Sequence, residues 1–252
     1  MTSREATSYL PLSDDALWPE DVERTASDWA HVLAFGAIGW PWLARSLSGG
    51  SKRAKRELLE RLDLAPDALP NLGSWKADTG FLTLIVDHIL ERKPETVVEL
   101  GAGASSLVIG KALQKSSGSG SGQLISCDQH ADFVAATHEW LRENGVEADL
   151  RATPFRRPPG DWPGVWYDHG PLPPQIDLLI VDGPPWTIHP YVRGAAESLF
   201  DRMPVGGTVM LDDAARPGER VVARRWRRRW PNFEFKLVNK GTKGTLIGTR
   251  LR

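Results

Sequence analysis

The chain has 252 residues, of which 41% are hydrophobic and 25% charged, and its formal net charge is -1 at pH 7. These values are ordinary for a soluble globular protein, and the small net charge excludes a global attraction to nucleic acid or anionic membranes. The single cysteine, Cys127, excludes an intrachain disulfide and a zinc site built from cysteines. Because residues 1–15 lack the basic and apolar pattern of a signal peptide, we expect a cytoplasmic protein.

The N-terminal part of the chain is expected to be helical. Residues 1–73 are interpreted as helices and loops that extend or cap a main domain at residues 74–252. Within them, the apolar segment 29–44 is shorter than the roughly 20 residues that a membrane span needs, and it contains Pro41. We therefore expect no membrane span. This tryptophan-rich segment is interpreted as a buried helix and turn, or as the interface of a homo-oligomer.

Hydrophobic periodicity predicts the elements from residue 51 onward. Helices are predicted at 51–64, 80–93, 105–114, 131–145, 191–203 and 219–230. Apolar runs predict strands at 96–100, 124–129, 147–153, 176–183 and 206–213, followed by a closing pair of strands within 233–251. Residues 115–123 form a polar loop, and residues 154–175 an irregular insertion rich in proline and tryptophan. The alternation predicts an α/β fold with a doubly wound, Rossmann-like sheet of seven mostly parallel strands and an antiparallel edge strand.

The stretch VVELGAGASS, residues 97–106, predicts a strand that ends in a glycine turn. In a doubly wound sheet, ligands bind at the carboxyl ends of the strands. Gly101 and Gly103 allow the tight turn there and let a ligand approach the backbone. Asp128 ends the second strand and can accept the hydroxyls of an adenosine ribose. Ser106 stands where a nicotinamide-binding fingerprint carries its third glycine, so the turn alone favours a small-molecule cofactor without identifying it.

Three acids follow two neighbouring predicted strands. Asp182 ends the fourth strand, and Asp212 and Asp213 end the fifth. Three adjacent carboxylates repel one another unless they are neutralised, and Mg²⁺ favours such oxygen ligands. A metal ion there would lower the pKa of an acceptor hydroxyl and orient its oxygen. In the alternative interpretation, Asp212 or Asp213 caps the following turn or pairs with Arg216 or Arg220.

The motifs VVELGAGASS, ISCDQ and DLLIVDGPP together resemble the class I S-adenosylmethionine-dependent methyltransferases over residues 75–252. More narrowly, WYDHG, IDLLIVDGPP and GGTVMLDDAARPGER are similar to a group of bacterial small-molecule and sugar O-methyltransferases. The resemblance implies S-adenosylmethionine as cofactor, with the glycine turn lining its methionine part and Asp128 binding its ribose. The cofactor-binding residues implied in this way are Glu99, Gly101, Ala102, Gly103, Ser105, Ser106, Asp128, Gln129 and Asp182.

The base that this family usually carries shortly after the fourth-strand acid is missing, because the prolines of GPPW (183–186) stand there. The candidate catalytic residues are therefore Asp182, His189 and His169. A histidine can accept a hydroxyl proton near neutral pH, although either histidine could equally be structural.

The sequence favours methyl transfer to a hydroxyl of a small molecule, such as a sugar or glycan. Aromatic rings can cover sugar faces, so Trp162, Trp166 and Tyr167 of the insertion and the tryptophan-rich N-terminal segment are the predicted acceptor site. Mg²⁺ is a further expected cofactor, bound by Asp182, Asp212 and Asp213.

Two alternatives stay open. GPPW is similar to the D/N-P-P-aromatic loop of nucleic-acid amino-methyltransferases, but Gly183 offers no side chain to bind an amine. The stretch RRWRRRW (224–230) places Val222, Trp226 and Trp230 on one stripe, which predicts a solvated helix face rather than a nucleic-acid channel. We therefore expect no nucleic-acid partner. A non-catalytic cofactor-binding scaffold protein is the other alternative, because the family base is missing.

Overall fold

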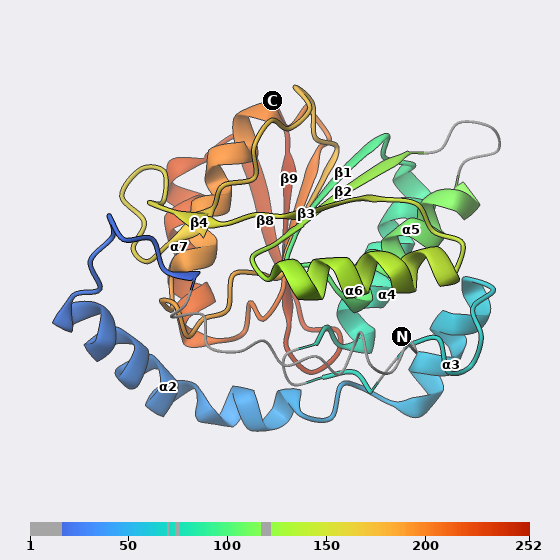
Figure 1. Ribbon diagram of the computed structural model, residues 1–252, viewed down its shortest axis with the longest axis horizontal. Coiled ribbons are helices and arrows are strands. Elements are labelled where there is room, and N and C mark those ends of the chain that lie inside the picture. The colour runs from blue at the N-terminus through green and yellow to red at the C-terminus, as the bar shows by residue number, and fades with distance from the viewer. Residues whose placement is uncertain (1–16, 70, 74–75, 117–121) are drawn as a thin grey trace.

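A computed structural model describes residues 17–69, 71–73, 76–116 and 122–252. At its centre lies a seven-stranded sheet in the order β3-β2-β1-β6-β7-β9-β8 (Figure 1). The strands are β1 (Thr96–Leu100), β2 (Gln123–Asp128), β3 (Asp149–Ala152), β6 (Leu178–Val181), β7 (Thr208–Leu211), β8 (Phe233–Val238) and β9 (Thr245–Arg250). Residues 1–15, on which the expected compartment depends, lie outside the described residues, as do residues 117–121 of the predicted polar loop.

The sheet is parallel from β3 to β7, and β9 runs antiparallel to both β7 and β8. The predicted α/β fold class is thereby confirmed, with the antiparallel pairing at the β9–β8 end. Strand order reverses at β1, which pairs with β2 on one side and β6 on the other. In doubly wound sheets, ligands bind beyond the carboxyl ends of the strands at such a switch point, which here is formed by β1 and β6.

Helices cover both faces of the sheet (Figure 1). They are α2 (Ala26–Ser46), α3 (Lys52–Arg61), α4 (Thr79–Arg92), α5 (Ala104–Ser116), α6 (Ala131–Glu143), the 3-10 helix η2 (Val192–Arg202) and α7 (Pro217–Arg229). The helices predicted from residue 51 onward are confirmed, although residues 192–202 form a tighter helix than the predicted α-helix.

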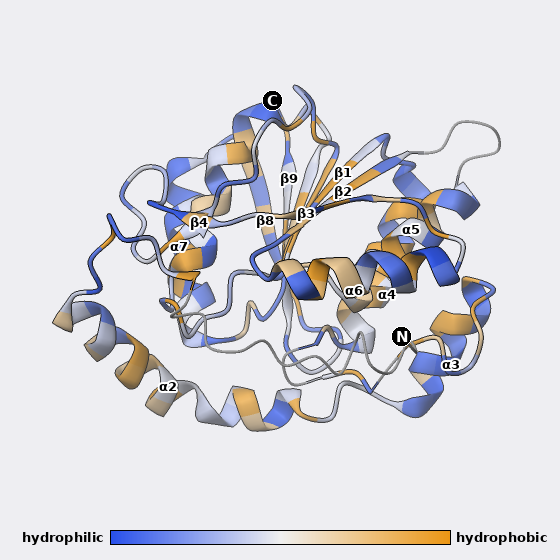
Figure 2. Cartoon of the chain, viewed as in Figure 1, coloured by the Kyte–Doolittle hydropathy of each residue, from blue (hydrophilic) through white to orange (hydrophobic). Residues whose placement is uncertain are grey.

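The core has two layers, because neighbouring strand residues point to opposite faces. Val97 packs in the layer beneath α3, α4, α5 and α6, and Val98 in the layer with η2, α7 and the insertion. The central strands are accordingly strongly hydrophobic in Figure 2, whereas β8 and β9 at the edge are mixed or pale. Leu58 and Leu59 of α3 belong to the first layer, so this N-terminal helix contributes to the core of the sheet domain.

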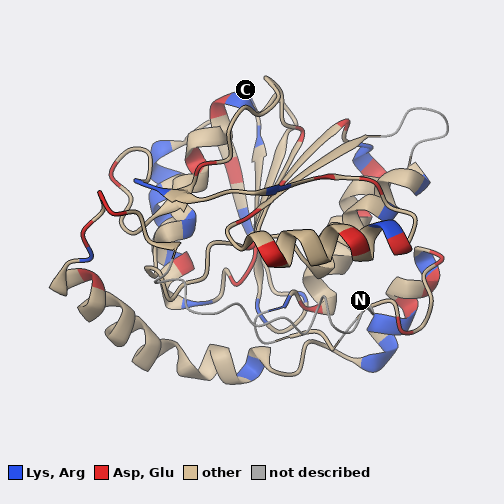
Figure 3. Ribbon diagram, in the orientation of Figure 1, with Lys and Arg blue, Asp and Glu red and all other residues tan. Residues whose placement is uncertain are grey.

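Helix α2 lies along the outside of the molecule (Figure 1). It is one continuous helix that contains Pro41, and it begins with a capping box between Thr25 and Asp28. The prediction of a buried helix and turn is wrong here, because Trp40 is 64% exposed and Leu33 is 71% exposed. Figure 3 shows that α2 carries charges only near its two ends. The expected oligomer interface stays a prediction, and no described helix has both the length and the apolar character needed to cross a bilayer.

The insertion packs into the core instead of surrounding an acceptor. Its two short strands, β4 (Phe155–Arg156) and β5 (Trp166–Tyr167), pair antiparallel. Trp162, Trp166 and Tyr167 are all buried beside the second layer, so the prediction that their rings face an acceptor is wrong. Large aromatic rings bury the most apolar area when they close such a layer, which explains their position.

Helix α7 confirms the predicted apolar stripe. Val222 and Trp226 are fully buried, and Arg225 stacks its guanidinium 3.9 Å above the Trp162 ring. Arg229 donates from Nη2 to both carboxylate oxygens of Asp161, at 2.7 and 2.9 Å. Arginines of this stretch thus hold α7 against the insertion.

Candidate active site

The glycine turn follows β1 directly. Gly101 has a φ of 101°, which favours glycine, and a Cβ there would lie 2.7 Å from the backbone nitrogen of Gly183. The ends of β1 and β6 therefore approach more closely than any side chain would allow. Gly103 has a φ of 150°, and the nearest atom to a Cβ at this position is 3.7 Å away, on Phe133. After Ala102 and Gly103 the chain enters α5 at Ala104.

A buried carboxyl group fastens the turn from below. Glu99 Oε2 accepts hydrogen bonds from the hydroxyls of Ser106 and Ser126, both at 2.5 Å. Ser106 Oγ in turn accepts from the backbone N–H of Gly103 at 3.0 Å. Burial raises the pKa of Glu99 to about 7, although the hydroxyls of Ser105, Ser106 and Ser126 oppose this rise. Within the described chain, Glu99 Oε1 is buried without a hydrogen-bond partner.

Asp128 and Gln129 lie beside the turn, at the end of the neighbouring strand β2. Both are largely buried, and Asp128 Oδ1 accepts a hydrogen bond from the backbone N–H of His130 at 3.0 Å. The Tyr167 hydroxyl donates to Gln129 Oε1 at 3.2 Å and lies only 2.2 Å from where a Cβ on Gly183 would be. Tyr167 therefore lines the floor between β2 and β6, a role that its position in an irregular insertion did not reveal.

These residues fit the cofactor that the sequence resemblance implies. A glycine turn, an acid below it and an acid at the next strand end lie together at the switch point of the sheet. The unpartnered Oε1 of Glu99 offers an acceptor for a cationic group, and Asp128 offers one for hydroxyls. The predicted cofactor residues at β1 and β2 are thus brought to one place.

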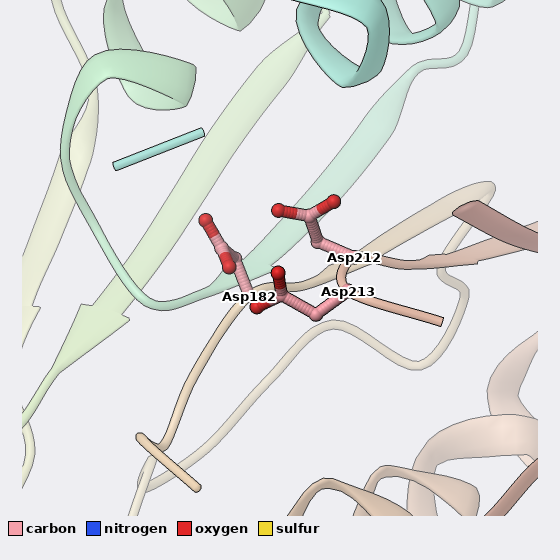
Figure 4. A group of neighbouring side chains, drawn as sticks. All are labelled: Asp182, Asp212 and Asp213. Carbon is pink, nitrogen blue, oxygen red and sulfur yellow. The ribbon is translucent and has the colours of Figure 1, made fainter. Parts of the chain in front are cut away.

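The three predicted acids also meet. Asp182 directly follows β6, and Asp212 and Asp213 directly follow β7. One carboxylate oxygen from each of the three lies within 4.8 Å of the others (Figure 4). Adjacent parallel strands end at the same edge of a sheet, so the sequence prediction that these acids converge is confirmed.

Three cations of the chain, of which Arg193 and Lys243 are buried, occupy the same cluster. Arg193 lies 3.4 Å from Asp182 Oδ1 and 3.1 Å from Asp213 Oδ2, and it also donates to the backbone oxygen of Asp182. Arg216 pairs with Asp213 at 2.9 Å, as the alternative interpretation of the sequence anticipated. Lys243 Nζ lies 3.5 Å from both Asp212 Oδ2 and Asp213 Oδ1.

Sequence reasoning missed Arg193 and Lys243. Arg193 lies on a predicted helix, and Lys243 lies in the turn of the closing strand pair. At neither position does the local sequence predict that a positively charged side chain points inward. The short, glycine-flanked stretch KGTKG (240–244) is the only local signal, because such a turn brings its backbone close to neighbouring elements.

Charge and burial set opposite protonation tendencies in the cluster. Burial alone would raise the pKa of Asp213, but Lys243, Arg216 and Arg193 outweigh it and lower the pKa to about 2. Burial dominates at Asp212 and raises its pKa well above the ordinary value, against the opposing effect of Lys243. Burial also raises the pKa of Asp182, whose side chain is 12% exposed and thus the most accessible of the three.

This donor set does not fit the predicted Mg²⁺ ion. Three carboxylates face three built-in cations, so their charge is already balanced. An Mg²⁺ ion bound by Asp212 and Asp213 at about 2.1 Å would share the space between them with the Lys243 ammonium group. Two cations so close in a buried site repel strongly.

The candidate base His189 lies beneath α2. Its Nδ1 accepts from the backbone N–H of Tyr191 at 3.1 Å, and its Nε2 is 3.9 Å from Asp28 Oδ1. Its ring packs against His31 and Tyr191. Burial lowers the pKa of His189 to about 4, and only 2% of the residue is exposed. These contacts place His189 between α2 and the core.

The candidate base His169 lies at the opposite end of the parallel sheet. Its backbone oxygen accepts from Arg151 of β3 at 3.2 Å, and its Nδ1–H donates to the Gly170 oxygen at 2.8 Å. Strands β2 and β1 separate β3 from β6, a distance of about 14 Å at about 4.8 Å per strand. The contacts that the structure gives His169 are thus with Arg151 and Gly170, and His169 stays a candidate base.

A groove next to the acid cluster separates α2 from the start of α7. It is lined by Phe35, Gly39, Leu43, Trp186, Pro190, Arg216, Pro217, Gly218 and Glu219. The Trp186 ring fits against Gly36 of α2, where a Cβ would lie 3.1 Å from it. Arg216 both lines this groove and pairs with Asp213, so it links the groove to the cluster.

Comparison with known proteins agrees with this architecture. Residues 98–214 match a family described as "Methyltransferase domain". The fold is similar to that of a methyltransferase from Geobacter sulfurreducens, with 19% identity, 79% of this chain and 87% of that chain covered, and a TM-score of 0.51.

Two further solved structures carry a donor or its product. The O-methyltransferase TomG from Streptomyces achromogenes, in complex with S-adenosylmethionine, shares 14% identity over 90% of this chain and 100% of that chain, with a TM-score of 0.51. An O-methyltransferase from Bacillus cereus, in complex with S-adenosylhomocysteine, shares 13% identity over 87% and 99%, also with a TM-score of 0.51. At these identities the likeness shows the fold. No curated protein matches the chain by sequence.

Proposed function

We propose that the protein methylates a hydroxyl of a small molecule, such as a sugar or glycan, with S-adenosylmethionine as the donor. Residues 98–214 match a family described as a methyltransferase domain, which supports this proposal. The observation that carries this proposal is the contact between the cofactor turn and the acid-bearing strand end. A Cβ on Gly101 would lie 3.0 Å from the carbonyl carbon of Asp182. A donor held by the turn would therefore have Asp182 beside it.

When bound, S-adenosylmethionine supplies a methyl group on a cationic sulfur, which the acceptor oxygen displaces in line. The protein contributes position and a proton acceptor. Asp182 is the proposed base, because its carboxyl group is the most accessible of the three acids and a carboxylate can accept a hydroxyl proton; burial raises its pKa. Arg193 holds this carboxyl group in place from its buried side.

The groove between α2 and α7 is the proposed acceptor site. Phe35 and Trp186 offer aromatic faces that can cover a sugar or another ring. Arg216 and Glu219 add polar groups that can orient hydroxyls. In this proposal the N-terminal segment takes part in acceptor binding, as the sequence suggested, while the insertion does not.

Calorimetry with S-adenosylmethionine and with NAD tests the cofactor. We expect binding of the former and none of the latter; no heat from S-adenosylmethionine near 1 mM would refute the assignment. Release of S-adenosylhomocysteine over a panel of sugar, glycan and phenolic acceptors then tests the reaction. Asp182→Asn should lose turnover while keeping cofactor affinity. The exposed Asp201→Asn is the matched control and should behave as wild type.

The same measurements address the two alternatives. A scaffold protein would bind the cofactor without turnover on any acceptor. A nucleic-acid methyltransferase would bind DNA or RNA with an affinity that falls steeply with salt, because phosphate contacts release counterions. Arg225 and Arg229 already pair within the chain, which favours neither a channel nor such a salt dependence.

A further inference from the structure

We propose that Lys243 takes the place of a divalent cation at the carboxyl ends of β6 and β7, so that methyl transfer at this site needs no metal ion. The ammonium nitrogen lies 3.5 Å from Asp212 Oδ2 and 3.5 Å from Asp213 Oδ1. It therefore bridges the two carboxylates that follow β7, which are the pair that a metal ion would have to join.

Charge balance supports this substitution. Lys243, Arg193 and Arg216 face Asp182, Asp212 and Asp213, and all but Arg216 and Asp182 are at most 5% exposed. Water screens such a cluster poorly, so an added divalent ion would place more positive charge beside three cations of the protein. A site for Mg²⁺ would need fewer protein cations among its ligands.

The fold also fixes the backbone on both sides of Lys243. Asp78, the N-cap of α4, accepts hydrogen bonds from the backbone N–H of Thr242 at 2.5 Å and from its hydroxyl at 2.8 Å. The backbone N–H of Ala215 donates to the Lys243 oxygen at 3.1 Å. Lys240 pairs with Asp87 at 3.2 Å. The β8–β9 turn is thus fastened on both sides of Lys243.

Two buried carboxylate oxygens of the cluster, Asp212 Oδ1 and Asp213 Oδ1, lack a hydrogen-bond donor among the described residues, and the Asp213 oxygen lies 3.5 Å from Lys243 Nζ. The Asp212 oxygen is where a metal ion would gain its best new contact once the ammonium group were removed. Lys243→Met should therefore create a metal site, since it deletes the positive charge and keeps an unbranched chain of similar length.

Mn²⁺ titration followed by electron paramagnetic resonance tests the proposal on the intact protein. We expect no stoichiometric site with Kd below about 1 mM in wild type or in the control Lys240→Met, and a site at least tenfold tighter in Lys243→Met. A stoichiometric Mn²⁺ site in wild type that is lost in Asp213→Asn would overturn the proposal. So would a folded Lys243→Met protein that binds Mn²⁺ no better than wild type.

A second measurement needs only wild-type protein, in case Lys243→Met does not fold. Its melting temperature should be the same within 1 °C in Mg²⁺ and in chelator. A site with Mg²⁺ present at about a hundred times its Kd would raise Tm by about 5–10 °C. Such a rise in wild type, if it is lost in Asp213→Asn, would contradict the proposal. That catalysis needs no metal ion rests on the proposed function. These experiments measure metal binding and not methyl transfer, so the proposal about Lys243 and the proposed function can fail separately.

Discussion

Replacing Glu99 by glutamine should make the protein more stable and a weaker cofactor binder at the same time. The glutamine carbonyl oxygen can still accept from Ser106 and Ser126, which now donate to Glu99 Oε2. Its amide group stands where the unpartnered Oε1 lies. The substitution therefore keeps the hydrogen bonds of the turn and removes only the negative charge.

The magnitude follows from the pKa of Glu99, which burial raises from 4.5 to about 7. At about 1.4 kcal/mol per pKa unit, the proton binds to Glu99 more favourably in the folded than in the unfolded state by about 3 kcal/mol. The folded protein binds this proton more tightly than the unfolded chain does. Stability from this group is therefore greatest below pH 4.5 and falls as the pH rises through 7. Between pH 5 and pH 8, wild type should lose about 2–3 kcal/mol of unfolding free energy relative to Glu99→Gln.

Urea unfolding at pH 5, 6.5 and 8 measures this difference, with the exposed Glu147→Gln as control. Calorimetry at pH 8 should show S-adenosylmethionine binding weakened by about tenfold or more, because a charge-assisted hydrogen bond is lost. Equal pH dependence of unfolding in wild type and Glu99→Gln would refute the reasoning about the buried charge. Unchanged cofactor affinity would refute the role of Oε1.

Three further substitutions probe the frame of the site. Gly183→Ala places a Cβ 2.2 Å from the Tyr167 hydroxyl and should lower Tm by several degrees; adding Tyr167→Phe should recover part of this loss, as differential scanning calorimetry will show. Asp78→Ala removes the N-cap of α4 and the acceptor for Thr242, and should lower the free energy of unfolding in urea by about 2–4 kcal/mol. Trp186→Ala should raise the acceptor KM about tenfold while cofactor affinity, measured by calorimetry, stays within twofold of wild type.

The sequence predicts most of the fold, because strands buried on both faces are visible as apolar runs. The run at 96–100 coincides with β1, and the sheet has the predicted class. The N-terminal segment was harder, since its composition resembles a core helix although α2 lies outside with Trp40 exposed. Apolar composition shows that a segment can be buried, but only tertiary packing shows whether this chain buries it.

The candidate site also contains residues that the sequence predicts and residues that it does not. Residues that end parallel strands were predictable, because topology brings strand ends to one edge; Asp182, Asp212 and Asp213 meet for this reason. Their partners were not, because Arg193 and Lys243 reach the cluster from a helix and from a turn 30 residues after Asp213. Pairing over such a separation depends on how the elements pack and leaves no periodic trace in the sequence.

The fastened β8–β9 turn has a consequence for the order in which the protein matures. The cofactor turn and the three acids are all synthesised before Lys243, so a growing chain holds an acid cluster with one of its three cations absent. Until Thr242 reaches Asp78 and the hairpin closes, like charges oppose docking of β6 and β7 ends. Closure of this last hairpin thus completes the charge pairing of strand ends that precede it in the sequence by about 30 residues or more, which makes the C-terminal turn part of the assembly of the site.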